Sequence, residues 1–364
     1  MAPLIDNFDQ QLTTVYASAL ASGELIFTPS EAHKSKETEY DIECDICYAP
    51  SLAKKPIGIL PKVEEDQTTS TDRPSTPVVK EVAKTNPFLP HSPALYVTDA
   101  SEEHKILLNK YCIVPRHFLV VTKKFQPQTG PLTPDDLMAV WNTLKAVKNS
   151  RDALAYYNCG SRSGASQPHK HMQVIPLESP SPIAELVREV SKRRPGKKEN
   201  KPGDLFSVPF HCINHVILLP DPAASNKDEE DILIEAYITL VDAMMMSIRE
   251  YAEQEELTDE ERMLCSTAIS SFAYNWILTK EFMMIVPRKQ EGFGPISINS
   301  LGFAGMVLTK TAEELEMVQK TGVMELVSKT GFVFHQERTP EQEQKSREMQ
   351  QVLETQMGSA LSSL

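Results

Sequence analysis

The sequence predicts an α+β fold built from two related half-units, each an antiparallel sheet with packed helices. Short apolar segments separated by Gly, Pro and polar residues recur in both halves, as they do in antiparallel sheets. Segments with apolar residues at helical spacing lie between them. The tetrapeptide Ile-Val-Pro-Arg at 113–116 recurs at 285–288, in each case at the end of a predicted strand. We therefore expect a duplicated unit that forms one compact body.

The chain divides into two halves and a tail. We expect an N-terminal half over 1–203, a C-terminal half over 204–337 and a Gln- and Glu-rich tail over 338–364, which is a loosely docked helix or disordered. Residues 61–85 are rich in Thr, Ser, Pro and charge, which is typical of a mobile excursion. The basic run at 192–201 indicates a linker.

The first half begins with a predicted helix over 4–24, because its apolar residues fall on one stripe at helical spacing. Thr133 has the place of an N-cap, since two aspartates occupy the first turn of the amphipathic segment that follows. A Gly- and Ser-rich loop at 160–168 lies between two apolar segments. The predicted strands of this half are 94–97, 105–110, 118–123, 154–158 and 172–177.

The second half repeats this style. Residues 228–253 predict a long helix that runs from an acidic start into an amphipathic segment. Thr311 is expected to cap a further helix that extends through Val318. The predicted strands are within 208–219, a hairpin over 272–279 and 283–287, and a strand region over 296–308.

Composition and charge narrow the function. The chain has 364 residues and a net charge of −13, which argues against nucleic acid or an anionic membrane as a partner. A small anionic substrate stays open, because a few local cations could hold it. No run of 18 apolar residues and no signal-peptide pattern are visible. The six cysteines form no dense framework, so we expect reduced thiols and a cytoplasmic location.

The segment 167–173 concentrates the reactive side chains. Alternation along a strand places His169, His171 and Gln173 on one face. The preceding loop can present backbone N–H groups and hydroxyls to phosphate oxygens. Neutral imidazole is a good nucleophile toward phosphorus, so the pattern indicates transfer through a histidine-bound phosphoryl group. The pattern alone also allows two surface histidines on an edge strand, or a His-x-His metal site.

The run 158–173, with Asn158-x-Gly160 and His169-x-His171-x-Gln173, resembles the histidine-triad superfamily, in the branch with Gln in place of the third His. That branch holds galactose-1-phosphate uridylyltransferase and the fungal diadenosine tetraphosphate phosphorylases, also called ATP adenylyltransferases. The wider sequence is similar to the phosphorylases over roughly 45–310. The stretches that carry this similarity are 50–56, 86–88, 107–110, 128–133, 274–275, 279–280 and 300–306.

The resemblance implies a histidine-triad-like fold and a reversible reaction, in which diadenosine tetraphosphate and phosphate give ATP and ADP. It implies that His171 becomes adenylylated and that Gln173 hydrogen-bonds the transferring phosphate. A divalent cation, Mg²⁺, is expected to arrive with the polyphosphate, and no metal-binding residues are expected. The other implied substrate-binding positions are Lys54 or its neighbour Lys55, Asn86, Asn158, Ser163, Gly164, Ala165, Ser166, Gln167, Asn275 and Lys280.

Two other functions compete with this one. A sugar-1-phosphate nucleotidyl transferase on the same scaffold would share the His171 chemistry and differ in its acceptor pocket. A nucleotide-binding protein without catalysis would need no nucleophile, so the intact His-x-His-x-Gln motif speaks against it. We also expect the second half, which has no His-x-His, to leave the active site mainly to the first half.

Cys44-x-x-Cys47 has the spacing of zinc ligands. The uridylyltransferase relatives can bind structural zinc with such a pair and histidines, and here His117 and His169 are candidate partners. A single pair is a weak signal, because free cysteine is commonly a small buried hydrophobe. We therefore predict no tightly bound stoichiometric zinc.

Overall fold

The computed structural model describes residues 7–38, 41–54, 86–148, 152–192, 200–225, 227–254, 257–271 and 273–333. The predicted excursion at 61–85 and the predicted tail at 338–364 lie outside these residues, as does most of the predicted linker. No helix in the described ranges is both long enough and apolar enough to cross a membrane.

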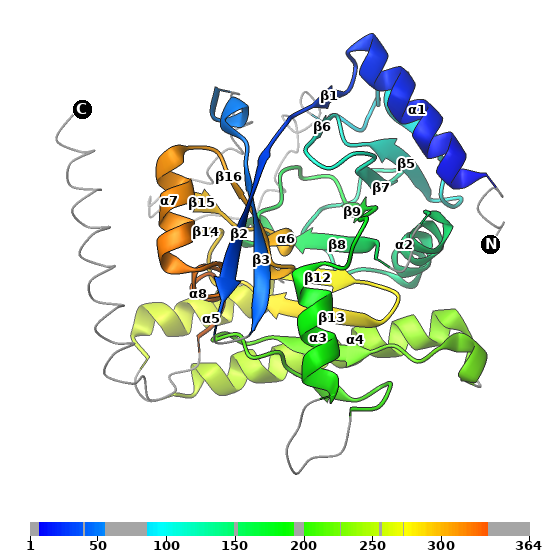
Figure 1. Ribbon diagram of the computed structural model, residues 1–364. Helices are drawn as coiled ribbons and strands as arrows, with labels where there is room; N and C mark the ends of the chain where they lie inside the picture. The colour runs from blue at the N-terminus through cyan, green and yellow to red at the C-terminus, as the bar shows by residue number, and fades with distance from the viewer. Residues whose placement is uncertain are drawn as a thin grey trace, which may run out of the picture.

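One antiparallel sheet, with nine strands among the described residues, organises the molecule (Figure 1). Its order is β10-β11-β13-β12-β8-β9-β7-β5-β4. The strands of the first half are β4 (Tyr96–Asp99), β5 (His104–Leu108), β7 (Phe118–Thr122), β8 (Leu154–Cys159) and β9 (His171–Ile175). Those of the second half are β10 (Leu205–Phe206), β11 (His215–Leu218), β12 (Tyr274–Leu278) and β13 (Phe282–Pro287).

The two half-units meet edge to edge at the centre of this sheet. Strand β12 pairs antiparallel with β8, with Asn275 opposite Asn158. The order β8-β9-β7 on one side is matched by β12-β13-β11 on the other, which confirms the predicted pair of related half-units. The repeated tetrapeptide does not mark equivalent places. Residues 285–287 lie in β13, whereas 113–116 follow the short strand β6 (Tyr111–Cys112).

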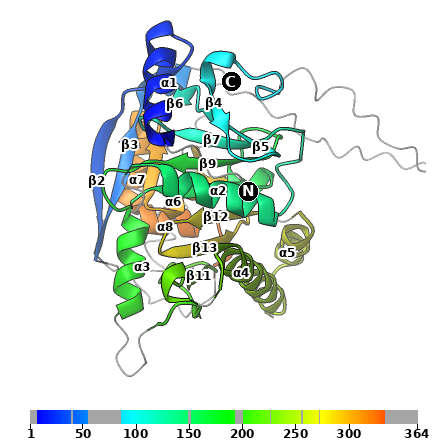
Figure 2. The same ribbon diagram turned by 90° about the vertical axis from the view of Figure 1, so that its right-hand side faces the viewer.

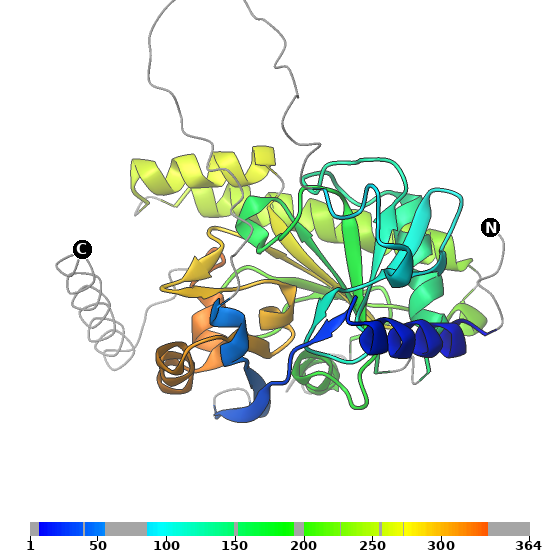
Figure 3. The same cartoon turned by 90° about the horizontal axis from the view of Figure 1, so that it is seen from above.

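Two layers cover the sheet, one on each face (Figure 2). The core on one face is built with α1 (Phe8–Ser22), α2 (Pro134–Ala146), α4 (Glu229–Ala252) and α5 (Asp259–Ser271). The core on the other is built with β3 (Ile42–Tyr48), α3 (Pro182–Lys192), α6 (Ser300–Phe303), β16 (Met306–Thr309), α7 (Ala312–Thr321) and α8 (Val323–Ser328). Seen from above, α4 and α5 lie on the opposite side of the sheet from α7 (Figure 3).

Short elements complete the fold. Strand β2 (Glu31–Glu37) pairs antiparallel with β3, and β16 pairs parallel with β3. The remaining pairs are β1 (Ile26–Phe27) with β6, and β14 (Gly292–Phe293) with β15 (Ile296–Ser297). The short 3₁₀ turns are η1 (Pro50–Lys54), η3 (Pro93–Leu95), η4 (Ser161–Ser163) and η5 (Pro222–Ala224).

Local signals explain the elements around β9. Thr133 caps α2, since its side chain accepts from Asp136 N while the Asp136 carboxylate accepts from Thr133 N. Along β9, Met172 and Val174 pack in the core that contains α2, so the odd-numbered residues face the other way. The predicted alternation of the histidine segment is confirmed.

The predicted strand over 296–308 is wrong in its middle. Residues 300–303 form the helical turn α6 between β15 and β16. The Asn299 side chain accepts a hydrogen bond from Leu301 N and starts this turn. Gly305, at φ +81°, then redirects the chain into β16. The apolar residues that suggested one strand therefore belong to a strand, a helical turn and a second strand.

Candidate active site

His171 opens β9, which lies between β7 and β8 in the interior of the sheet. The alternative of surface histidines on an edge strand is therefore wrong. His171 Nδ1 lies 2.8 Å from the backbone oxygen of His169. A carbonyl oxygen only accepts, so Nδ1 carries the hydrogen and Nε2 keeps its lone pair. Burial lowers the pKa of His171 to about 4, so the ring is neutral at pH 7.

His169 holds a fixed orientation beside the nucleophile. Its Nε2 donates to the backbone oxygen of Thr122 at 2.9 Å, and its Nδ1 accepts from Asn86 Nδ2 at 3.0 Å. Both ring nitrogens are thus engaged, and Nδ1 of His171 is engaged as well. The metal-site alternative for His-x-His does not fit this arrangement, because only Nε2 of His171 is left to coordinate.

Phe88 covers both imidazoles. Its ring centroid lies 5.6 Å from that of His169 and 5.3 Å from that of His171. Lys105, a buried lysine on β5, donates from Nζ to the Phe88 backbone oxygen at 2.8 Å. Lys105 stands opposite Val121, which stands opposite His171, so all three share one face of the sheet. Sequence reasoning missed Lys105, because only this strand register brings it to the face of His171.

Gln173 is held as a donor. Tyr156 stands opposite it in the β8–β9 ladder and donates from its hydroxyl to Gln173 Oε1 at 2.8 Å. The oxygen of the Gln173 amide is therefore occupied, and its Nε2 is the group that can donate to a phosphate oxygen. Burial raises the pKa of Tyr156, so this hydroxyl keeps its proton.

Gln128 joins the two strands that carry the site. Its Oε1 accepts from His171 N at 2.8 Å, while its Nε2 donates to the backbone oxygens of Asn158, at 2.9 Å, and His171, at 3.2 Å. Sequence reasoning included Gln128 in a matching stretch but gave it no role. Its contacts are long-range, so local pattern alone carries no signal for them.

The loop after β8 is anchored on two buried asparagines. Asn275 Nδ2 donates to Asn158 Oδ1 at 2.8 Å and to the Ser163 backbone oxygen at 2.9 Å. The Ser163 hydroxyl donates to the Gly160 backbone oxygen at 2.6 Å, so its hydrogen is used within the loop. Both predicted asparagines therefore lie at the loop. The Asn275 amide group is used to hold Asn158 and Ser163 in place.

The other predicted loop residues differ in exposure. Gly164 has φ +77°, which suits glycine, and an added Cβ would lie 2.7 Å from the Ile298 backbone oxygen. Ala165 and Gln167 are half-buried, and Ser166 is exposed. The loop therefore leads from Asn158 to the histidine strand with Ser166 open to solvent.

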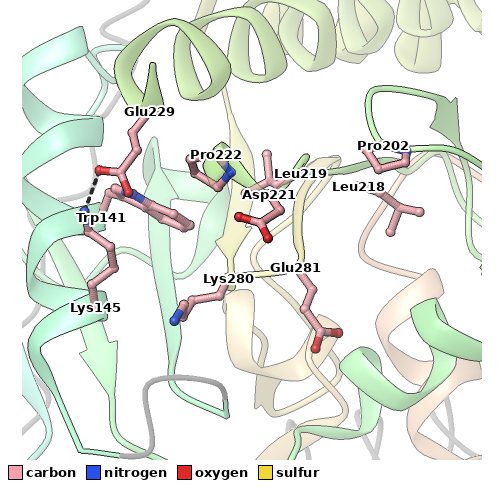
Figure 4. A pocket seen from close by; sticks show the side chains of 10 residues that line it. All are labelled: Trp141, Lys145, Pro202, Leu218, Leu219, Asp221, Pro222, Glu229, Lys280 and Glu281. Atoms are coloured by element: carbon pink, nitrogen blue, oxygen red, sulfur yellow. Dashed lines mark hydrogen bonds and ion pairs between the residues drawn. The ribbon is translucent and has the colours of Figure 1, made fainter. Parts of the chain in front are cut away.

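The structure does not bring Lys280 to His171. Lys280 lies in the turn after β12, at the opposite end of that strand from Asn275. It lines a cavity of about 650 Å³ (Figure 4) that none of His169, His171 or Gln173 lines. The residues around this cavity are Trp141, Lys145, Pro202, Leu218, Leu219, Asp221, Pro222, Glu229, Lys280 and Glu281. Of the predicted Lys54, only the backbone at the end of η1 is described, and Lys55 lies outside the described residues.

The cysteine pair lies on β3. Cys44 is fully buried in the core, and Cys47 is half-buried. Burial raises the pKa of both thiols. The candidate partner His117 accepts at Nδ1 from Asn109 Nδ2 at 3.1 Å. Among the residues that the structure describes, no group of three or more His, Cys, Asp and Glu could hold a metal ion. The absence of zinc stays a prediction that elemental analysis of chelator-free protein can check.

Two family models match consecutive parts of the chain. The model described as the Ap4A phosphorylase N-terminal domain matches residues 51–189. The model described as the ATP adenylyltransferase C-terminal domain matches residues 206–333. The chain belongs to the Ap4A phosphorylase family. The first matched segment contains β4 to β9, and the second begins within β10 and contains β11 to β13.

Two relatives in Saccharomyces cerevisiae match most of the chain. "Diadenosine 5',5'''-P1,P4-tetraphosphate phosphorylase 2" is 30% identical over 327 residues, which cover 85% of this chain and 90% of that protein. "Protein APA1" is 29% identical over 308 residues, which cover 82% and 85%. The crystal structure of yeast Ap4A phosphorylase Apa2 in complex with AMP matches with a TM-score of 0.67 and 27% identity, over 91% of this chain and 99% of that one. The complex of Apa2 with Ap4A matches with a TM-score of 0.65.

Proposed function

We propose that this chain catalyses the reversible phosphorolysis of diadenosine tetraphosphate (Ap4A), in which Ap4A and phosphate give ATP and ADP. The observation that carries the proposal is the state of His171, a buried neutral imidazole whose Nε2 lone pair is unused. Membership of the Ap4A phosphorylase family and the likeness to an Apa2 structure that holds Ap4A support the choice of substrate.

The first half-reaction adenylylates His171. Nε2 attacks the α-phosphorus of one adenosine end, the N–P bond forms, and the bond to the bridging oxygen breaks so that ATP leaves with the electron pair. The ring becomes cationic at this point. Its Nδ1–H donates to the His169 backbone oxygen, which stabilises that charge. Gln173 Nε2 and the N–H groups of the 160–168 loop donate to the phosphoryl oxygens.

The second half-reaction returns the enzyme. A phosphate oxygen attacks the same phosphorus, the N–P bond breaks, and the electron pair returns to Nε2 as ADP forms. Phosphate arrives already nucleophilic, whereas water would need a general base. The amide of Gln173 cannot serve as that base, and Tyr156 occupies its oxygen. Lys54 or Lys55 is the proposed contact for the incoming phosphate.

A divalent cation, Mg²⁺, is proposed to arrive with the polyphosphate as part of the substrate. The described residues offer no cluster of acidic side chains that would hold such an ion on the protein. Oxygens of the polyphosphate itself are suitable ligands for Mg²⁺. In this view the chain binds the substrate complex and supplies no metal ligands of its own.

We also propose a cytoplasmic location. Within the described residues all six cysteines are free thiols, five of them buried, which suits a reducing compartment. Fluorescence microscopy of the tagged full-length chain checks this, and a secreted protein would contradict it.

Nucleotide separation tests the proposed function. The full-length protein is incubated with Ap4A and millimolar phosphate, and products are resolved by anion-exchange chromatography. Phosphorolysis gives ATP and ADP in equal amounts, whereas hydrolysis through the same intermediate gives ATP and AMP. A main product pair of ATP and AMP at millimolar phosphate would overturn the transferase assignment. Replacing Ap4A with a nucleoside diphosphate sugar tests the sugar-nucleotide alternative in the same assay.

A further inference from the structure

The second half-unit places a buried arginine beside the loop of the first. Arg288 directly follows β13 and is fully buried. No carboxylate in the described part of the chain lies within ion-pair distance of its guanidinium. Its guanidinium instead donates to the side-chain oxygen of Asn275 and to a set of backbone oxygens. These belong to Ile298 at 3.0 Å, Gln290 at 2.8 Å, Glu291 at 2.8 Å, Thr330 at 3.4 Å and Ser163, in the loop, at 3.5 Å.

Such a charge is an expensive group to place in a core. Burial lowers the pKa of Arg288 to about 9, which leaves it charged at pH 7 without a counter-ion in contact. Buried ionic groups are often no more stabilising than apolar residues of similar volume. The stability of the core therefore gives no reason for an arginine here, whereas its effect on the neighbouring polar groups does.

Arg288 fixes the direction of a chain of amide hydrogen bonds. It can only donate, so the atom of Asn275 that faces it must be Oδ1. Asn275 Nδ2 then faces the other way, where it donates to Asn158 Oδ1 and to the Ser163 backbone oxygen. Without the arginine, the Asn275 amide could rotate and place its oxygen against that of Asn158.

The same chain of bonds orients Asn158. Its Oδ1 accepts from Asn275 Nδ2, and from Ser300 N at 3.0 Å and Ser300 Oγ at 2.7 Å. With Oδ1 held by these donors, Nδ2 of Asn158 is the part of the amide that can donate elsewhere. Asn158 is joined to His171 through Gln128, which contacts the backbone of both. The chain of bonds that starts at Arg288 therefore orients an amide group on the strand beside the nucleophile.

The loop itself rests on the same carbonyl group that Arg288 holds. Arg288 donates to the Ile298 backbone oxygen, and Gly164 packs so closely against this oxygen that a Cβ there would lie 2.7 Å away. A shift of the 298–300 segment would thus move the loop as well as Ser300. Arg288 reaches the loop by three routes, one direct to the Ser163 backbone oxygen at 3.5 Å, one through Asn275 and one through Ile298.

We propose that Arg288 is a positioning residue for nucleotidyl transfer, which acts through Asn275 to hold Asn158 with its Nδ2 toward the substrate and to hold the 160–168 loop. This inference rests on the proposed function. It gives the second half-unit, whose strand β13 lacks a histidine, a defined part in the reaction of the first. A misplacement of about 1 Å around the reacting atoms can slow a reaction by roughly 10²-fold.

A double-mutant cycle tests the route. Arg288→Lys, Asn158→Ala and the double variant are compared in kcat and KM for Ap4A phosphorolysis, with Arg262→Lys as the matched control. Arg262 also donates to backbone oxygens, those of Ala252 and Gln254, away from the site. We expect Arg288→Lys to lower kcat by about tenfold or more with a small change in KM. In the Asn158→Ala background the same change should lower kcat by a clearly smaller factor, because only its effect on the loop is left.

Stability and function are separated by two further measurements. Amide exchange across 160–167 in the unliganded protein should speed up in Arg288→Lys and stay unchanged in Arg262→Lys. If Arg288→Lys does not fold, Asn275→Ala takes its place in the cycle with the same expected coupling. Effects on kcat that simply multiply, or wild-type kcat in the variants, would overturn the proposal. Inactive wild-type protein would instead refute the proposed function, while the exchange result would still judge the positioning role.

Discussion

At the scale of single residues, the site depends on which atom of each polar group is already occupied. The backbone oxygen of His169 accepts from His171 Nδ1, and the Tyr156 hydroxyl donates to Gln173 Oε1. These two contacts leave His171 Nε2 and Gln173 Nε2, the atoms that the reaction needs, unoccupied. Residue types and strand alternation are local properties of the sequence, so they predicted His171 and Gln173. The occupied atoms depend on partners in three dimensions, so the sequence could not predict them.

The lowered pKa of His171 makes its pH dependence a direct test. Because the neutral form is retained down to about pH 4, the rate of adenylyl transfer should be nearly constant between pH 7.5 and 5.5. An ordinary histidine, with a pKa near 6.5, would lose about tenfold over that range. Single-turnover rapid quench with Ap4A measures the rate. A drop that follows a pKa near 6.5 would contradict the buried neutral nucleophile.

Gln173 should act in both half-reactions, since the same phosphorus is attacked twice. Gln173→Ala is expected to slow each by about 10²-fold, as when an oxyanion donor is removed. Tyr156→Phe should slow both by a smaller factor, because the amide is kept but no longer fixed. Burst kinetics resolve the two steps, and Tyr251→Phe on α4 serves as a control far from the site. An effect confined to one half-reaction would argue against a shared donor.

At the scale of elements, the sequence predicted those that carry local signals. The Thr133 cap, the strands around the loop and the helix over 228–253 are examples. The helices α3 and α5 and the β2–β3 pair were not predicted, and 300–303 was assigned to a strand. The helical turn α6 forms because Asn299 caps it and Gly302 packs closely on Ile298. The spacing of apolar residues in the sequence does not reveal either feature.

A buried charge network ties α2 to the back of the histidine strand. The Asp136 carboxylate accepts from His104 Nε2 at 2.7 Å and from Lys170 Nζ at 3.0 Å. Although burial opposes it, these donors and Thr133 N lower the pKa of Asp136 to about 2. A depressed carboxylate pKa stabilises the fold above about pH 4, and this contribution is lost as the pH falls toward 2.

Asp136→Asn should therefore destabilise the protein at pH 7 by about 3–5 kcal/mol, because Lys170 is left as an uncompensated buried charge. Urea unfolding measures the change. Asp135→Asn, at the exposed neighbouring position in the same helical turn, is the control and should change the free energy of unfolding by less than about 0.5 kcal/mol. Equal effects of the two variants would show that the network contributes no stability.

At the scale of the whole molecule, two related half-units share one active site. The expectation that the first half builds it holds for the histidines and Gln173. It is incomplete for the loop, because Asn275, Arg288 and Ser300 come from the second half. The single pairing of β8 with β12 brings these residues together. Such a pairing joins segments more than a hundred residues apart, so a reading of each half alone could not reveal it.

Three histidines with lowered pKa values, His117 and His171 buried and His215 half-buried, should make the whole fold sensitive to mild acid. Burial lowers the pKa of His117, His171 and His215 to about 4 in each case. The unfolded chain binds these protons near pH 6.5, so stability falls as the pH drops from about 6.5 to 4. The three groups together give a slope of up to about 4 kcal/mol per pH unit.

Unfolding free energies at pH 7, 6 and 5 check this slope. His215→Gln removes one of the three groups at a position outside the active site. It should reduce the pH dependence of the unfolding free energy by about a third. A pH dependence that is the same in wild type and His215→Gln would contradict burial of the neutral ring.

The central claim is a covalent adenylyl group on Nε2 of His171, and peptide mapping tests it most directly. The protein is mixed with Ap4A without phosphate, quenched in alkali to preserve the N–P bond, digested and examined by mass spectrometry. We predict one adenylyl group on the peptide that contains His171. It should be absent in His171→Ala and should be released as ADP when phosphate is added before the quench. An adenylyl group on another residue, or turnover by His171→Ala at the wild-type rate, would contradict the account.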